Sequence, residues 1–80
     1  MKLTILFFGI TTDLVGKSSL NYNLEEKTTV KVLKSTLKLE FSGLKNIHEF
    51  AIAVNEEYAN DDLIIKEGDV VAIIPPVSGG

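Results

Sequence analysis

Cysteine is absent from this chain of 80 residues, and histidine occurs once, as His48. Without cysteine the protein has no disulfide framework, no thiol nucleophile and no cysteine-based zinc site. A single histidine cannot supply the several ligands that a metal site needs. We therefore expect no bound metal or cofactor, and we interpret His48 as a loop or surface residue. No constellation of side chains for self-contained catalysis remains.

Long apolar runs and an excess of positive charge are also missing. No stretch approaches the roughly 20 apolar residues that a membrane-spanning helix requires. Lys2 and the apolar residues after it have the outline of a secretory signal, but no Ala-x-Ala-like cleavage site follows them. The net charge is −3, whereas binding to a phosphate backbone relies on clustered lysine and arginine. We expect a cytoplasmic protein with neither a membrane nor a nucleic acid as partner.

Stretches rich in β-branched, leucine and aromatic residues predict the strands. They are Lys2–Gly9, Ser18–Leu24, Phe50–Asn55 and Val70–Ile74. Residues 10–17 contain threonine, aspartate and glycine, and we expect them to form a loop between the first two strands. Glu56-Glu57 should begin a turn or a short return strand through Tyr58-Ala59, and Asn60-Asp61-Asp62 is a turn signal.

One helix is predicted between the second and third strands. Its apolar residues recur at three- and four-residue steps, at Val30, Leu33, Leu37 and Phe41. Thr28 or Thr29 is a suitable N-cap, because its hydroxyl can accept a hydrogen bond from a free backbone N–H. Ser42-Gly43 is a glycine stop, and residues 44–49 are expected to be irregular.

Strands on both sides of a single helix define an α+β order. A chain of 80 residues can then hold one mixed sheet with the helix on one face. In this arrangement we expect the first and last strands to be central and parallel, joined by a crossover that contains the helix. Residues 1–76 should form one domain, and residues 77–80 a flexible tail.

The carboxyl end is the candidate working group of the protein. Its two prolines lack the N–H that a sheet ladder needs, so they should end the last strand and direct the chain away from the body. Its two glycines have no Cβ and can pass through a narrow channel. Six residues span at most about 20 Å when extended, which is enough to carry the terminal carboxylate into another protein. These residues are Pro75, Pro76, Val77, Ser78, Gly79 and Gly80.

The sequence resembles the family of molybdopterin synthase small subunits, a set of ubiquitin-like sulfur carriers. The ending Pro75-Pro76-Val77-Ser78-Gly79-Gly80 after Gly68-Asp69-Val70-Val71-Ala72 is similar to the family's ending. Phe7-Phe8-Gly9 resembles its Phe-Phe-Ala step, and Ala53-Val54-Asn55 its Ala-Val-Asn strand end. A departure occurs at Ile10-Thr11-Thr12-Asp13, where the family often has a Leu-Arg-Glu-like stretch.

The resemblance implies a β-grasp fold and a function as sulfur donor. In the family, an E1-like adenylating enzyme uses ATP and magnesium to convert the terminal carboxylate into an acyl-adenylate. A sulfur donor protein then leaves a thiocarboxylate, which on this chain would sit on Gly80. The tail would enter the large synthase subunit, which passes the sulfur to cyclic pyranopterin monophosphate in an assembly of two small and two large subunits. Catalytic lysines belong to the large subunit, so this chain would not be an enzyme alone.

The predicted strands are apolar on both faces, which is unusual for a sheet covered by one helix. One face of such a sheet meets water and should carry polar residues. An exposed apolar patch usually marks a partner surface. We predict that the patch docks beside the entrance for the tail, on the large subunit and on the adenylating enzyme in turn. Its predicted residues are Leu6, Phe8, Tyr58 and Ile74.

Other functions stay open at this point. A related carrier could deliver sulfur for thiamine or for tRNA thiolation, and a ubiquitin-like modifier could be joined to lysines. An interaction domain with a frayed terminus of small residues is the third alternative. The ending Pro-Pro-Val-Ser-Gly-Gly favours molybdopterin synthesis over the thiamine carrier.

Overall fold

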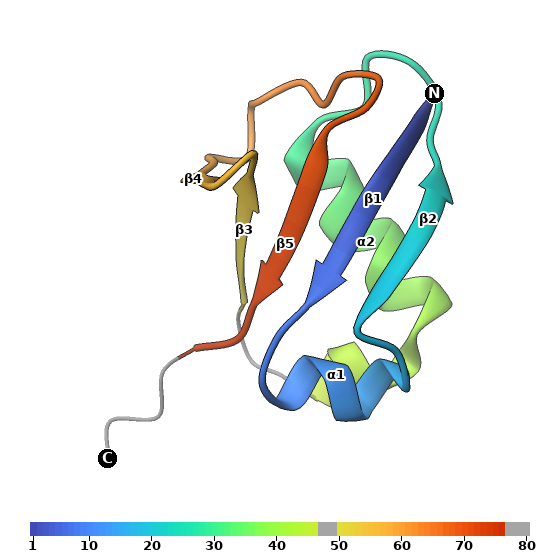
Figure 1. The fold of residues 1–80 in the computed structure, drawn as a ribbon, viewed down its shortest axis with the longest axis vertical. Helices are drawn as coiled ribbons and strands as arrows, with labels where there is room; N and C mark the ends of the chain where they lie inside the picture. Colours follow the sequence, from blue (N-terminus) through green and yellow to red (C-terminus); the bar gives the residue numbers. More distant parts are fainter. Residues whose placement is uncertain (47–49, 77–80) are drawn as a thin grey trace.

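The computed structural model describes residues 1–46 and 50–76. Within these ranges the chain forms a five-stranded sheet, and helix α2 (Val30–Glu40) packs across one of its faces (Figure 1). A shorter helix, α1 (Ile10–Val15), and a 3₁₀ helix, η1 (Ser42–Asn46), lie near the end of the sheet where the first strand ends. The strands are β1 (Lys2–Phe7), β2 (Ser19–Asn23), β3 (Ala51–Val54), β4 (Glu57–Tyr58) and β5 (Val70–Ile74).

The sheet is mixed, with the order β2-β1-β5-β3-β4. β1 and β5 lie inside the sheet and run parallel, in register from Thr4 opposite Val70 to Phe7 opposite Ile73. The remaining pairs among these strands are antiparallel. The predicted α+β architecture, with the first and last strands central and parallel, is confirmed.

The core lies between the sheet and α2. Every second side chain of β1 and β5 faces the helix, because successive residues of a strand point to opposite faces. These side chains are at most 3% exposed, and the helix side chains that meet them are fully buried. The strands contribute Leu3, Ile5, Phe7, Val71 and Ile73, and the helix contributes Val30, Leu33 and Leu37.

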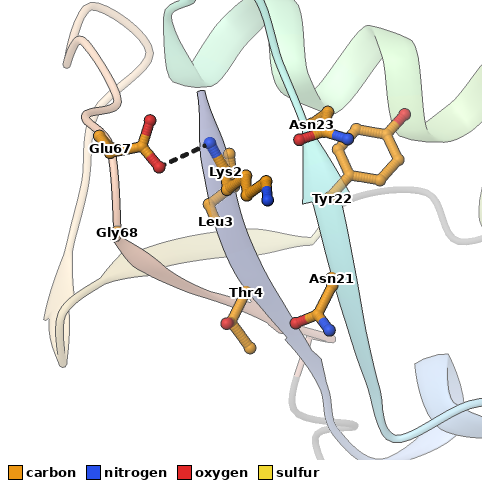
Figure 2. Close-up of a pocket in the computed structure, with 8 residues that line it drawn as sticks. All are labelled: Lys2, Leu3, Thr4, Asn21, Tyr22, Asn23, Glu67 and Gly68. Carbon is orange, nitrogen blue, oxygen red and sulfur yellow. Dashed lines mark hydrogen bonds between the residues drawn. The ribbon is translucent and has the colours of Figure 1, made fainter.

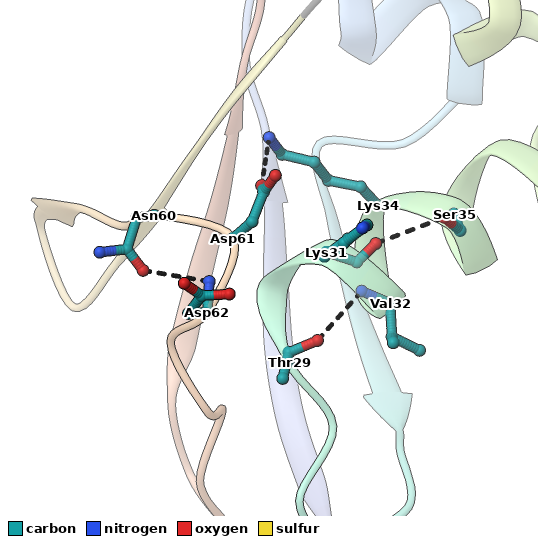
Figure 3. Close-up of polar contacts among 8 residues, drawn as sticks. All are labelled: Thr29, Lys31, Val32, Lys34, Ser35, Asn60, Asp61 and Asp62. Atoms are coloured by element: carbon teal, nitrogen blue, oxygen red, sulfur yellow. Dashed lines mark hydrogen bonds and ion pairs between the residues drawn. The ribbon is translucent and has the colours of Figure 1, made fainter.

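Helix α2 begins where the sequence predicts. Thr29 is its N-cap, and its hydroxyl oxygen accepts a hydrogen bond from the Val32 N–H at 3.3 Å. Figure 3 shows this cap beside the predicted turn, in which the Asp62 N–H donates to Asn60 Oδ1 at 3.1 Å. Lys34 Nζ reaches across to Asp61 Oδ1 at 3.1 Å, so the turn is also tied to the helix.

The end of α2 differs from the prediction. The helix ends at Glu40, with Phe41 as an extended C-cap, and η1 follows at once. The expectation of irregular chain is therefore wrong for residues 44–46. Leu44 explains the difference, since it is fully buried and its N–H donates to Phe41 O at 2.9 Å. Residues 47–49, which include His48, lie outside the described residues.

Helix α1 replaces the loop that was expected over residues 10–17. The fully buried Thr11 sets its start, because the Thr11 hydroxyl accepts a hydrogen bond from the Phe8 N–H at 2.9 Å and donates one to Phe8 O. The Thr12 hydroxyl donates to Phe7 O at 3.0 Å. Thr12 thus bonds to the last residue of β1, and Thr11 bonds to the residue that follows it. In a sequence, threonines that start a helix in this way are hard to distinguish from threonines of a loop.

Candidate functional site

The candidate site lies on the open face, which we define as the sheet face opposite α2. Figure 1 shows α2 on one side of the strands only. Alternate residues of β1 and β5 point to this face. The register of the strands shows which residues of neighbouring strands lie beside them on it. Leu6 lies opposite Ala72, and Ala72 lies opposite Ala53, so three strands contribute neighbouring apolar side chains to the open face.

The end of the open face beside β2 is polar. Lys2 and Thr4 of β1 lie opposite Asn23 and Asn21 of the edge strand β2. Figure 2 shows these side chains around a hollow of about 450 Å³, where the Lys2 N–H donates to Glu67 Oε2 at 2.9 Å. The solvent-facing side of the sheet is therefore polar at this end, as expected for a face that no helix covers.

The opposite end of the open face is apolar and forms a hollow of about 640 Å³. Small alanine side chains lie in its middle, and larger side chains stand around them. Phe8 is 48% exposed and Tyr58 is 75% exposed. We call this the apolar hollow; it is lined by Leu6, Phe8, Ala53, Asn55, Glu56, Tyr58, Val70, Ala72 and Ile74.

The structure thus brings the predicted patch residues together. Leu6, Phe8, Tyr58 and Ile74 all line the apolar hollow. Phe8 lies just beyond β1, which ends at Phe7 and so is two residues shorter than the predicted Lys2–Gly9. Their role in contacting a partner stays a prediction.

The sequence did not reveal that the turn between β3 and β4 belongs to this surface. Asn55 and Glu56 join the strands with φ angles of 51° and 72°. Asn55 is held against the start of β5, since its N–H donates to Val70 O at 2.8 Å and its Oδ1 accepts from the Val70 N–H at 3.0 Å. The sequence predicted a turn or a short return strand from Glu56 on, but the place of this turn beside β5 depends on sheet register.

The carboxyl end begins beside the body of the domain, at Pro75 and Pro76. β5 ends at Ile74, as predicted, and Pro75 and Pro76 follow without strand pairing. A groove of about 400 Å³ runs beside them, and Tyr58 and Ile74 line both this groove and the apolar hollow. The apolar surface is therefore continuous up to the point where the carboxyl end leaves the sheet.

The remaining predicted site residues, Val77, Ser78, Gly79 and Gly80, lie outside the described residues. The division into a 1–76 domain and a 77–80 tail accordingly stays a prediction. Within residues 1–46 and 50–76, no group of three or more His, Cys, Asp or Glu could hold a metal ion. No helix in these ranges is long and apolar enough to span a bilayer.

The fold and the surface together define a class, the ubiquitin-like β-grasp domains. The prediction of this fold is confirmed, because the solved structure described as molybdopterin converting factor, subunit 1, from Pyrococcus furiosus superposes with a TM-score of 0.87. That structure is 28% identical, and the match covers 96% of this chain and 99% of the other.

The chain belongs to the ThiS family, whose sequence pattern matches residues 5–80. The molybdopterin synthase sulfur carrier subunit of Arabidopsis thaliana is 32% identical over 100% of this chain and 84% of the relative. A solved complex of subunits 1 and 2 of the molybdopterin-converting factor from Helicobacter pylori contains a chain that is 30% identical, with a TM-score of 0.70 and full coverage of both chains. The resemblance seen in the sequence is confirmed.

Proposed function

We propose that this chain is the sulfur-carrier small subunit of a molybdopterin synthase. The observation that carries the proposal is the continuity between the apolar hollow and the exit of the carboxyl end at Ile74 and Pro75. A partner that covers the hollow would also meet the carboxyl end where it leaves the sheet at Pro75. The names of the Arabidopsis and Helicobacter proteins support the choice of molybdopterin synthesis over other sulfur-carrier pathways.

The chemistry follows from the terminal carboxylate of Gly80. A free α-carboxyl group has a pKa of about 3.5, so it is an anion at neutral pH and a poor electrophile. In the proposed cycle, an adenylating enzyme transfers AMP from ATP to this carboxylate with the help of magnesium, and pyrophosphate is released. A sulfur donor protein supplies sulfur at the oxidation level of sulfide, which attacks the acyl carbon and displaces AMP, and a thiocarboxylate remains on Gly80. ATP and magnesium belong to the partner enzyme.

The large synthase subunit is the proposed acceptor of the carboxyl end. Residues 75–79 would occupy the channel that leads to its active site, and residues of the large subunit would transfer the sulfur to cyclic pyranopterin monophosphate. Two small and two large subunits would form the assembly. The Helicobacter complex of subunits 1 and 2 supports a large-subunit partner. A cytoplasmic location is part of this proposal.

Intact mass spectrometry tests the proposal directly. After incubation with ATP, the cognate adenylating enzyme and a sulfur source, the mass should rise by about 16 Da, because sulfur replaces one carboxylate oxygen. The gain should disappear when Gly80 is deleted. One residue added after Gly80 should also abolish it, because the reactive carbonyl moves by about 3.5 Å. A lengthened chain that still gains sulfur would contradict the proposal.

A further inference from the structure

Glu56 is the one charged residue among those that line the apolar hollow. The other lining side chains are apolar or neutral, so a single carboxylate stands at the edge of an apolar surface. Among the described residues the only ion pair joins Lys34 to Asp61, and Glu56 therefore has no cationic partner there. Water can donate hydrogen bonds to this exposed carboxylate as long as no partner covers the hollow.

The backbone holds Glu56 in a fixed place. Its φ of 72° lies in the left-handed region, where glycine would fit without strain. The preceding Asn55 is hydrogen bonded to Val70, and Asn55 Nδ2 also donates to Asp69 Oδ1 at 3.0 Å. The turn that carries Glu56 is thus bonded to β5, which forms one wall of the hollow.

The neighbouring Glu57 provides a natural comparison. In the β3–β4 pair, Tyr58 lies opposite Ala53 and Glu57 lies opposite Val54. Tyr58 and Ala53 line the hollow. Since successive residues of a strand point to opposite faces, the Glu57 side chain lies on the other face of the hairpin. The two glutamates therefore carry the same charge at adjacent positions with different orientations.

The charge of the chain is also uneven around this turn. Residues 55–69 contain six acidic residues and one lysine, whereas the rest of the chain contains five acidic residues and seven lysines. Asp61 of this segment pairs with Lys34, and Glu67 lies at the polar end of the open face. Glu56 is therefore the charge of this segment that a partner meets at the apolar hollow itself.

We propose that Glu56 determines partner specificity by pairing with a lysine or arginine that the partner places at the rim of the apolar hollow. An apolar cover without a cation would remove water from the carboxylate and leave the charge uncompensated, which is costly. The inference rests on the proposed function, since it takes the large synthase subunit as the occupant. That subunit should present apolar side chains to the hollow and a basic group beside the β3–β4 turn.

Binding of the purified large subunit tests the inference with matched variants, Glu56→Gln and Glu57→Gln. Glutamine keeps the length of the side chain and removes its charge, so the turn is retained. At low salt we expect Glu56→Gln to weaken binding about tenfold and Glu57→Gln by less than about twofold. The salt dependence of the association rate should become less steep for Glu56→Gln alone, which a merely structural role would not produce.

The outcomes separate the inference from the function on which it rests. Equal effects of the two substitutions, with the wild-type chain still binding, would overturn the role of Glu56 and leave the synthase proposal intact. If the wild-type chain does not bind the large subunit at all, both fail. A dimer of the chain alone that Phe8→Asp converts to a monomer would show that a second copy occupies the hollow, and the inference would be wrong.

Discussion

Gly9 connects the start of the chain with its end. Its φ of 55° and ψ of −135° define a conformation that is almost restricted to glycine. A Cβ at this position would lie 3.1 Å from Pro75 Cγ, so the residue also leaves room for the first proline after β5. A single glycine therefore combines the turn into α1 with the direction in which the carboxyl end leaves the sheet.

We predict that Gly9→Ala lowers the free energy of unfolding by about 1–3 kcal/mol, the cost of holding a side chain in a sparsely populated backbone region. Gly16→Ala is the control, because Gly16 has a φ of 83° but nothing within 4 Å of the added Cβ. The control should lose less, since Gly16 lies in the αL region, where a side chain is less strained than at Gly9, and its Cβ would meet no neighbour. Chemical denaturation of both variants measures the difference, and equal losses would show that neither the rarer backbone conformation of Gly9 nor its contact with Pro75 adds a cost.

At the scale of elements, a hydrogen bond joins the edge strand β2 to the end of α2. The Tyr22 hydroxyl donates to Glu40 Oε1 at 3.0 Å. Partial burial raises the pKa of Tyr22 above 10.0, and the hydrogen bond to Glu40 and the negative charge of Glu40 act in the same direction. The folded protein thus holds the phenol proton more tightly than the unfolded chain does.

The sign of the resulting pH dependence follows from this raised pKa. The stabilisation is fully present below pH 10.0, the ordinary tyrosine value, and is lost as the pH rises through the higher folded value. In a Tyr58→Phe background Tyr22 is the only tyrosine, so its absorbance titration reports its pKa. We expect a pKa above that of the unfolded chain, and Glu40→Gln should lower it. A folded pKa at or below the unfolded value would refute the assignment.

Much of the element order could be predicted because local patterns decide it. β5 has the predicted bounds, and α2 has the predicted cap, since the apolar spacing and Thr29 both act within a few residues. The sequence did not predict α1, because the start of this helix depends on hydrogen bonds between the Thr11 hydroxyl and Phe8, the residue after β1. These bonds form only in the folded turn, so the pattern of apolar residues in the sequence does not indicate them.

The candidate site was predictable to a similar degree. The apolar residues on both faces of β1 and β5 predicted a patch with Leu6, Phe8 and Ile74, and these three residues line the same hollow. Glu56 was not assigned to this surface. Its place depends on a turn with two positive φ angles and on the bonds from Asn55 to β5, neither of which a pattern of hydrophobicity encodes.

At the scale of the whole molecule, the two faces of the sheet differ in what they contact. α2 covers one face and closes the core, whereas the open face runs from a polar end at β2 to the apolar hollow at β5 and β3. Because the hollow adjoins the exit of the carboxyl end, a partner that receives the terminus would also cover the hollow. The large subunit and the adenylating enzyme would then use overlapping contacts and should compete for the chain.

The last prediction tests this shared surface. Phe8→Asp and Ile74→Asp should each weaken binding to the large subunit and to the adenylating enzyme by more than about 2 kcal/mol, the range of interface hot spots. A carboxylate at either position would be buried without a partner, which explains the expected loss. Thr4→Asp is the matched control, since Thr4 lies on β1 and the same open face but at its polar end. Circular dichroism should show that all three variants stay folded. Unchanged affinity for the large subunit after both test substitutions would place the partner surface elsewhere on the domain.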